Sequence, residues 1–114
     1  MSPDETTIRT ANVLGSVLRD AGEHKLGTIR EVFFGAQTGQ AEFVILELSS
    51  VFGSGKFHPI PWSALRFHRD TKAYSTDLTK DILKGSPAYD RDQLADAGYA
   101  WGDQARRYFA DWVT

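Results

Sequence analysis

The middle of the chain reads Lys56-Phe57-His58-Pro59-Ile60-Pro61-Trp62-Ser63-Ala64-Leu65. Proline cannot donate a hydrogen bond to a β-ladder, so Pro59 and Pro61 predict an edge strand or a bulge rather than a central strand. The residues after Pro61, from Trp62 to Leu65, predict a tight turn. This stretch therefore indicates a strand at the border of a sheet, followed at once by a change of direction.

Short segments rich in apolar and β-branched residues lie on both sides of this stretch and are separated by turn residues. The turn signals recur about every eight to twelve residues, which favours a small barrel or sandwich over βαβ units. Residues 41–48 are apolar on one face and mixed on the other, as in a curled sheet whose outer face is partly covered. The expected strands are residues 13–18, 25–33, 41–48, 56–61, 66–68 and 72–75.

After Tyr74 the apolar period changes from that of a strand to that of a helix. Thr79 is expected to cap a short helix that runs through Lys84 and ends at Gly85. A longer helical face follows Tyr89, with a break into two shorter pieces expected near its glycines. That face consists of Leu94, Gly98, Trp101, Ala105, Tyr108 and Trp112, and the second glycine near the break is Gly102.

The composition is that of one ordinary globular domain. The chain has 114 residues, 13 Lys and Arg, 15 Asp and Glu, and no cysteine. A chain of this size can bury about two-thirds of its unfolded surface in a single core. The absence of cysteine excludes disulfide scaffolds, thiolate nucleophiles and cysteine-ligated metal centres. A net charge of −2 argues against a general binder of the phosphate backbone.

The ends and the apolar runs bear on location. Residues 1–10 are polar and lack periodicity, so we expect a flexible tail, and they carry no apolar region typical of a secretory signal. The longest apolar run, residues 43–46, is far shorter than the ~20 residues of a membrane helix. We therefore expect a cytoplasmic protein without a transmembrane segment.

The order of these signals resembles the PRC-barrel family, which includes the cytoplasmic barrel of a photosynthetic reaction-centre subunit, a domain of a ribosome-maturation factor and small stand-alone bacterial proteins. The resemblance covers roughly residues 11–90, and residues 60–65 are its most specific part. It rests on Leu14-Gly15-Ser16-Val17, Leu26-Gly27-Thr28-Ile29-Arg30-Glu31-Val32, Thr38-Gly39-Gln40-Ala41-Glu42-Phe43-Val44-Ile45, Ile60-Pro61-Trp62-Ser63-Ala64-Leu65, Asp77-Leu78-Thr79-Lys80 and Pro87-Ala88-Tyr89-Asp90.

This resemblance implies a mainly β fold, a small, strongly bent antiparallel barrel of about six strands followed by short C-terminal helices. The barrel would span residues 11–76, and a helical extension over residues 77–114 would pack on the barrel or on a dimer mate. The family is one of docking modules without a known catalytic centre. We therefore expect a non-catalytic adaptor for another protein, working as a homodimer.

Aromatic and proline side chains are the candidates for partner binding. Those near the edge strand suit partner recognition more than catalysis. The C-terminal aromatic face must be buried, but its amphipathic pattern does not identify the surface that covers it. That face either packs on its own barrel or crosses to a second copy of the chain. The candidates are Phe57, Pro59, Pro61, Trp62, Arg66, Trp101, Tyr108 and Trp112.

The alternative is an RNA- or ribosome-associated factor that uses the basic segment 56–72. Lys56, Arg66, Arg69 and Lys72 alternate there with aromatic side chains, a pattern that suits stacking on RNA bases. Strand alternation explains the same pattern more simply, since it turns aromatic side chains inward and charges outward.

The residue types of a metal site and of a catalytic triad are present in the sequence, but their spacing gives either site little support. A metal site would need His58, His68 and Asp70, which match no compact zinc spacing. A triad built on Ser63 lacks the glycines of a nucleophile elbow. We expect no catalytic residue, no cofactor and no metal, and the histidines are interpreted as surface residues.

Overall fold

The computed structural model describes residues 7–49, 56–68, 70–71, 73–95 and 101–112. Within these residues six strands form one sheet in the order β4-β3-β2-β1-β6-β5. The strands are β1 (Val17–Arg19), β2 (Lys25–Phe34), β3 (Ala41–Leu48), β4 (Phe57–Pro61), β5 (Leu65–His68) and β6 (Ala73–Thr76). The helices are α1 (Thr10–Val13), α2 (Lys80–Lys84), α3 (Arg91–Leu94) and α4 (Trp101–Tyr108), with 3-10 turns η2 (Trp62–Ala64) and η3 (Ala110–Trp112).

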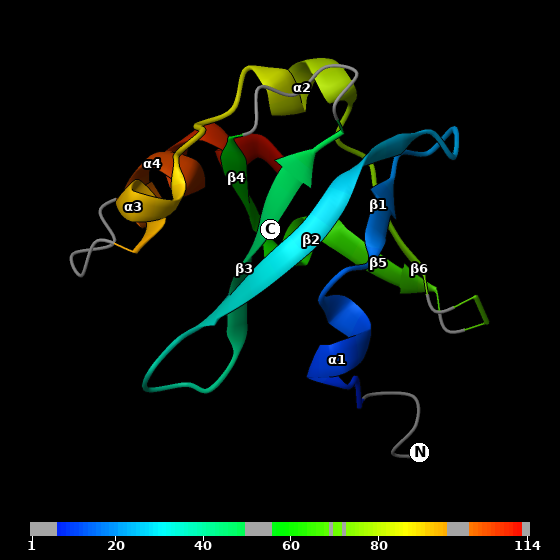
Figure 1. Cartoon of the computed structure of the whole chain (residues 1–114), viewed down its shortest axis with the longest axis horizontal. Helices are drawn as coiled ribbons and strands as arrows, with labels where there is room; N and C mark the ends of the chain where they lie inside the picture. The colour runs from blue at the N-terminus through cyan, green and yellow to red at the C-terminus, as the bar shows by residue number, and fades with distance from the viewer. Residues whose placement is uncertain (1–6, 50–55, 69, 72, 96–100, 113–114) are drawn as a thin grey trace.

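The sheet is a strongly curled half-barrel, which confirms the prediction of a mainly β fold with six strands and short helices after them (Figure 1). Its neighbouring strands are antiparallel, except that β1 and β6 pair in parallel over Leu18 and Arg19. Gly27 lets β2 approach β3 closely, since a Cβ there would lie 2.3 Å from the carbonyl oxygen of Glu47. The strand order places β4 and β5 at opposite edges of the sheet.

The first predicted strand, residues 13–18, is wrong over its first half. Val13 ends the short helix α1, and only Val17–Arg19 forms a strand. Gly15 turns the chain between them with a φ of 87° and donates its N–H to Ile29 across 2.7 Å. The apolar pattern reflected burial rather than extension, because Val13 packs into the core. In the predicted tail, Ile8 also packs against that core, and residues 1–6 lie outside the described residues.

Strand β3 is buried on both faces and separates two cores. We call the first the barrel core, which fills the inside of the curl, and the second the outer core, which lies between the sheet and α3 and α4. This arrangement confirms the partly covered outer face predicted for residues 41–48. The barrel core contains Val13, Leu18, Leu26, Ile29, Val44, Leu46, Leu48, Ile60, Tyr74, Leu78, Leu83 and Phe109, and the outer core contains Phe43, Ile45, Phe57, Leu94, Trp101 and Ala105.

The C-terminal segment joins the two cores. Trp101 and Ala105 of α4 lie in the outer core, whereas Phe109, directly after α4, is fully buried in the barrel core. Helix α4 packs against β4, beside which it lies in Figure 1. Arg106 secures it to β3, with its guanidinium 5.0 Å from the ring centroid of Phe43. Within the described chain Trp101, Ala105 and Phe109 therefore pack on the chain's own sheet, whereas Trp112 stays 39% exposed.

The expected short helix is confirmed in α2, where the Thr79 side chain accepts a hydrogen bond from the N–H of Ile82 and Gly85 follows the last turn. The expected division of the second helical region is confirmed by α3 and α4. The break falls where it was expected, since α3 ends at Leu94 and α4 begins at Trp101, next to Gly102, while Gly98 lies outside the described residues. Gly102 itself is buried inside α4, where an added Cβ would lie 3.3 Å from a terminal nitrogen of Arg106 and 3.9 Å from the ring of Phe43.

The hydroxyl of Tyr74 is buried in the barrel core and has no hydrogen-bond partner among the described residues. Burial raises the pKa of this phenol. We expect Tyr74→Phe to leave the free energy of unfolding unchanged or to raise it by up to about 1 kcal/mol, because an unpaired buried polar group is lost. Tyr108→Phe is the matched control. Its hydroxyl donates to the carbonyl of Ile82 across 2.7 Å, so its loss costs about 1 kcal/mol.

Urea denaturation of the two variants tests this pair of expectations. A loss of more than about 1 kcal/mol in Tyr74→Phe would mean that the hydroxyl is hydrogen-bonded in solution.

Candidate docking groove

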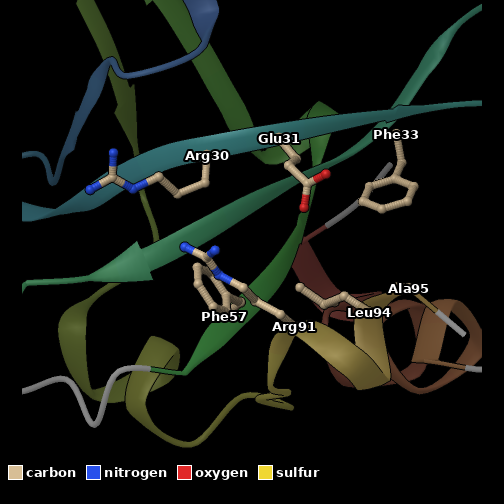
Figure 2. Close-up of a pocket in the computed structure, with 7 residues that line it drawn as sticks. All are labelled: Arg30, Glu31, Phe33, Phe57, Arg91, Leu94 and Ala95. Atoms are coloured by element: carbon tan, nitrogen blue, oxygen red, sulfur yellow. The ribbon is translucent and has the colours of Figure 1, made fainter.

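A groove of about 580 Å³ lies between β2 and α3, on the outer side of the sheet (Figure 2). Strand β2 supplies one wall, α3 supplies the other, and β4 contributes the ring of Phe57 between them. Its volume falls within the range of about 300–1,000 Å³ that is common for ligand pockets. The lining residues are Arg30, Glu31, Phe33, Phe57, Arg91, Leu94 and Ala95.

The β2 wall is shaped by a bulge. Ile29 opposes Leu46 and Glu31 opposes Ile45, so Arg30 is an additional residue in the ladder. A bulge breaks the strict alternation of a strand and changes where its side chains point. Arg30 and Glu31 are both exposed as a result, and Figure 2 shows them together with Phe33 along one side of the groove.

The α3 wall is held in place by backbone contacts and by a capping box. Tyr89, just before the helix, exchanges two backbone hydrogen bonds with Phe57 of β4, at 2.8 and 2.9 Å. The Asp90 side chain accepts from the N–H of Gln93, and the Gln93 side chain accepts from the N–H of Asp90. The bonds to Phe57 hold the chain before α3 against the sheet, and the capping box fixes the first turn of the helix, which carries Arg91.

The charged side chains of the groove keep unused hydrogen-bonding groups. Arg30 donates through Nε to Glu47 across 2.8 Å, which leaves its terminal amino groups without a partner among the described residues. The guanidinium of Arg91 lies 5.6 Å from the ring centroid of Phe57 and has no carboxylate partner in the described chain. Glu31 likewise has no hydrogen bond or ion pair with any described residue.

The two ends of the groove differ in chemistry. Arg30 and Arg91 reach toward one end, while Phe33, Leu94 and Ala95 line the other, with the carboxylate of Glu31 between them (Figure 2). The apolar end has a firm support, since the ring of Trp101 contacts Phe33 edge-on with 4.9 Å between centroids. The groove can therefore orient a ligand that is charged at one end and apolar at the other.

The edge strand β4 offers little to a partner strand. The backbone N–H and C=O of Phe57 bond to Tyr89, on the side of β4 that faces away from β3. Backbone groups alternate along a strand, so those of residues 59 and 61 point to the same outer side. Both are prolines and have no N–H to donate. The side chains of Phe57, Pro59 and Pro61 are buried in the chain itself. The edge therefore offers no N–H to a partner strand at positions 59 and 61.

The other predicted partner-binding residues are spread over the molecule. Trp62 is half-buried beside Tyr74, and Trp101 is 5% exposed in the outer core. Tyr108 is half-buried against α2, and the ring of Trp112, 39% exposed, stacks on it with 6.4 Å between centroids. Arg66 is exposed and forms an ion pair with Asp77. The structure does not bring these residues together at one surface.

Basic segment 56–72 does not form a uniform basic face in its described part. On β5 the exposed Arg66 and His68 alternate with the half-buried Phe67, as strand alternation predicts. A depression of about 650 Å³ beside them also carries Asp20, Glu23 and Asp70 among its lining residues. The side chains of Arg69 and Lys72 lie outside the described residues.

His58 is buried, so its interpretation as a surface histidine is wrong. It is 4% exposed, and its Nδ1 lies 2.8 Å from the hydroxyl oxygen of Ser86. Ser86 donates its own proton to the carbonyl of Leu83 across 2.6 Å, so the histidine Nδ1 must be the donor to Ser86. Burial lowers the pKa of His58 to about 4. This histidine is neutral and links β4 to the end of α2.

The residues considered for catalysis or metal binding lie apart. His58 and His68 belong to strands at opposite edges of the sheet, and His68 bonds through Nε2 to Ser75 of β6. Ser63 is exposed in η2, whereas the hydrogen-bond partner of His58 is Ser86. The described ranges contain no group of three histidines and acids that could hold a metal ion.

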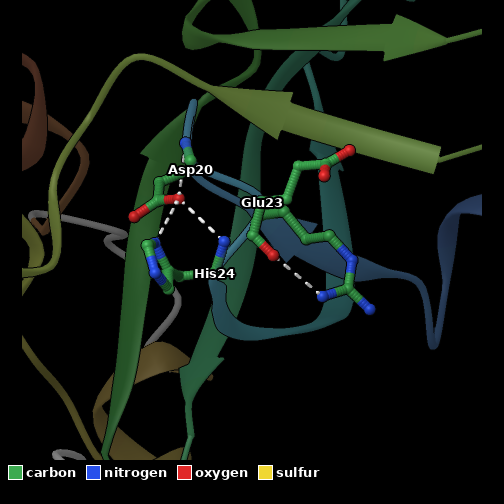
Figure 3. Close-up of polar contacts among 5 residues, drawn as sticks. Asp20, Glu23 and His24 are labelled. Atoms are coloured by element: carbon green, nitrogen blue, oxygen red, sulfur yellow. Dashed lines mark hydrogen bonds and ion pairs between the residues drawn. The ribbon is translucent and has the colours of Figure 1, made fainter.

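A second polar cluster, at the turn between β1 and β2, is explained by the turn itself (Figure 3). The carboxylate of Asp20 accepts from the N–H groups of His24 and Gly22, at 2.8 and 2.9 Å, and lies 3.2 Å from the His24 ring. The hydrogen bond from the His24 N–H is the main cause that lowers the pKa of Asp20. Arg19 donates to the carbonyl of Glu23, which adopts a φ of 67°. These contacts hold the turn in shape.

The groove draws on residues that the sequence analysis did not select, apart from Phe57. Arg30 and Arg91 are 61 residues apart in the chain, and only the fold brings them to one surface. Neither glycine nor proline stands at or next to Arg30, so the local sequence gives no signal of the bulge. The Asp90 and Gln93 pair of the capping box is the one local signal that places α3.

The comparison with protein families agrees with this architecture. The family model described as PRC-barrel domain matches residues 5–92. No curated protein matches the chain in sequence. Among solved structures, a Pseudomonas aeruginosa protein assigned as the 16S ribosomal RNA processing protein RimM is similar, with 12% identity and a TM-score of 0.49. That match covers 71% of this chain and 50% of the other, so the chain spans half of that protein's length.

No helix within the described ranges is long and apolar enough to cross a membrane. The family match extends over most of the sequence, and the residues it covers form the six strands of the curled sheet. The chain belongs to the PRC-barrel domain family.

Proposed function

We propose that the chain is a non-catalytic docking module, an adaptor that binds a partner protein in the groove between β2 and α3. The observation that carries this proposal is the pairing of unused guanidinium donors at one end of the groove with an apolar surface at the other. Protein-binding sites favour such arginine and aromatic groups on a firm support.

The chemistry of the remaining side chains supports a binding role over a catalytic one. A nucleophile needs a base within hydrogen-bond reach, and His58 instead donates to Ser86 inside the core. Its pKa of about 4 also leaves it a weak base.

A homodimer remains part of the proposal, with Trp112 as its contact. Trp101 and Phe109 already pack inside the chain, so they leave fewer aromatic side chains for a second copy than the sequence pattern suggested. Sedimentation at micromolar concentration tests this. We expect a dimer that Trp112→Ala weakens, and a monomer under all conditions would contradict it.

RNA binding through the basic segment is the less supported alternative. The ion pair of Arg66 with Asp77 and the acidic residues around the neighbouring depression reduce its positive potential. Binding to RNA would weaken steeply with salt. A salt-dependent affinity lost on charge reversal at Arg66, with the groove variants unaffected, would favour this alternative.

The docking function is tested by capture from a native lysate with matched variants. Arg91→Glu reverses a groove charge, and Arg107→Glu makes the same change at an exposed position of α4 away from the groove. We expect one or more proteins to be captured by the wild type and by Arg107→Glu but at least about tenfold less by Arg91→Glu. Capture profiles that are identical for all three proteins would contradict the proposal.

A further inference from the structure

Resting on the proposed docking function, we propose that the groove binds an extended segment of a partner protein in which an acidic side chain is followed by an apolar one. The order of groups along the groove is the basis. Guanidinium groups mark one end, a lone carboxylate lies in the middle, and apolar side chains line the other end.

The basic end binds the acidic side chain. The Nε of Arg30 is used by Glu47, but its terminal amino groups are free among the described residues, and Arg91 has no ion pair there. Arginine holds a carboxylate through two parallel hydrogen bonds, which is stronger than a contact between neutral groups. The ring of Phe57 beneath Arg91 keeps that guanidinium in place, so less side-chain freedom is lost on binding.

The carboxylate of Glu31 positions the backbone of the bound segment. It lies between the two ends and has no partner in the described chain, so it can accept a backbone N–H of a segment lying along the groove. It also disfavours a second acidic side chain at the centre by repulsion. A simple run of acidic residues therefore fits less well than one acid followed by an apolar residue.

The apolar end receives the next side chain. Phe33 and Ala95 lie on opposite walls there, and Leu94 is buried in the outer core beneath them. Because Trp101 supports Phe33 from behind, this surface is formed before a ligand arrives. The volume of about 580 Å³ leaves room for a short peptide segment but not for a folded domain.

The test uses capped synthetic hexapeptides and two-dimensional amide NMR of the intact chain. The probe contains an Asp-Leu pair flanked by glycine and serine, and the comparison peptides carry Asn-Leu, Lys-Leu or Asp-Ser instead. We expect the Asp-Leu peptide to shift the amides of Glu31, Phe33 and Ala95. The Asn-Leu and Asp-Ser peptides should bind about tenfold more weakly.

Variants of the chain complete the test. Arg91→Glu should weaken the Asp-Leu peptide at least about tenfold, whereas Arg107→Glu should leave its affinity within about twofold. Equal binding of the Asp-Leu and Asn-Leu peptides, or no effect of Arg91→Glu, would overturn the inference. So would preferential binding of octanoate, which would mark the groove as a site for an amphiphilic carboxylate rather than a protein segment.

Failure of this inference can be told from failure of the docking function. If the Lys-Leu peptide shifts the groove amides more than the Asp-Leu peptide, the acidic specificity is wrong while docking in the groove stands. If no peptide shifts these amides, the inference fails. The docking function then fails only if capture from lysate is also unaffected by Arg91→Glu.

Discussion

Replacing Trp101 with alanine is expected to lower the free energy of unfolding by about 3–5 kcal/mol. The indole is buried in the outer core, where its ring contacts Phe33 and Phe43 with centroid distances of 4.9 and 5.5 Å. Its Nε1 donates to the carbonyl of Leu94 across 3.3 Å, which ties α4 to the end of α3. The substitution removes the support of both helices on the sheet.

Urea denaturation followed by far-ultraviolet circular dichroism measures this loss. Phe34→Ala is the matched control, because that ring is 55% exposed and its removal should cost only about 1 kcal/mol. Similar losses for the two variants would contradict the arrangement. If the Trp101 loss instead depended strongly on protein concentration, the indole would contact a second copy rather than its own sheet.

Acid is expected to destabilise the protein through His58, with a total loss of about 3 kcal/mol as the pH falls from about 6.5 to 4. Burial lowers the pKa of this imidazole in the folded chain to about 4, against 6.5 for an unperturbed histidine. Between these values the unfolded chain binds the proton and the folded chain does not. Stability from this group is therefore fully present above pH 6.5 and is lost as the pH approaches 4.

Urea midpoints across this pH range, compared with those of His58→Asn, provide the measurement. Asparagine can donate to Ser86 in place of Nδ1 but does not titrate, so the variant should lose most of the steep fall below pH 6.5. A His58→Asn variant with the same pH dependence as the wild type would contradict the neutral, buried state of His58.

Local patterns predicted much of the fold correctly. The alternation and apolar character of residues 41–48 gave the bounds of β3 and its covered outer face. Thr79 and Gly85 gave α2, because capping depends on a few neighbouring residues. Where packing decided the outcome, local patterns were less reliable. The apolar character of Val13 predicted the start of a strand. Val13 instead ends the short helix α1, and its side chain is buried in the core.

The groove and the state of His58 depend on contacts distant in sequence. Strand alternation predicted the inward, half-buried side chain of Phe67 but not the burial of His58, because Ser86 at the end of α2, 28 residues away, covers that side of β4. The prolines of β4 were identified correctly as residues of an edge strand, where they remove two N–H donors from the outer edge. Arg30 and Arg91 line one groove only because of the bulge in β2 and the bridge between Phe57 and Tyr89.

The docking groove is tested most directly by amide hydrogen exchange. The exchange rates of the chain are compared with and without a partner that was purified by the capture experiment. Binding in the groove predicts added protection in residues 30–33 and 91–95, and no change in residues 65–68 and 73–76. The Arg91→Glu variant should show no added protection at the same partner concentration. Protection confined to β5 and β6, with the groove unchanged, would contradict the proposed function.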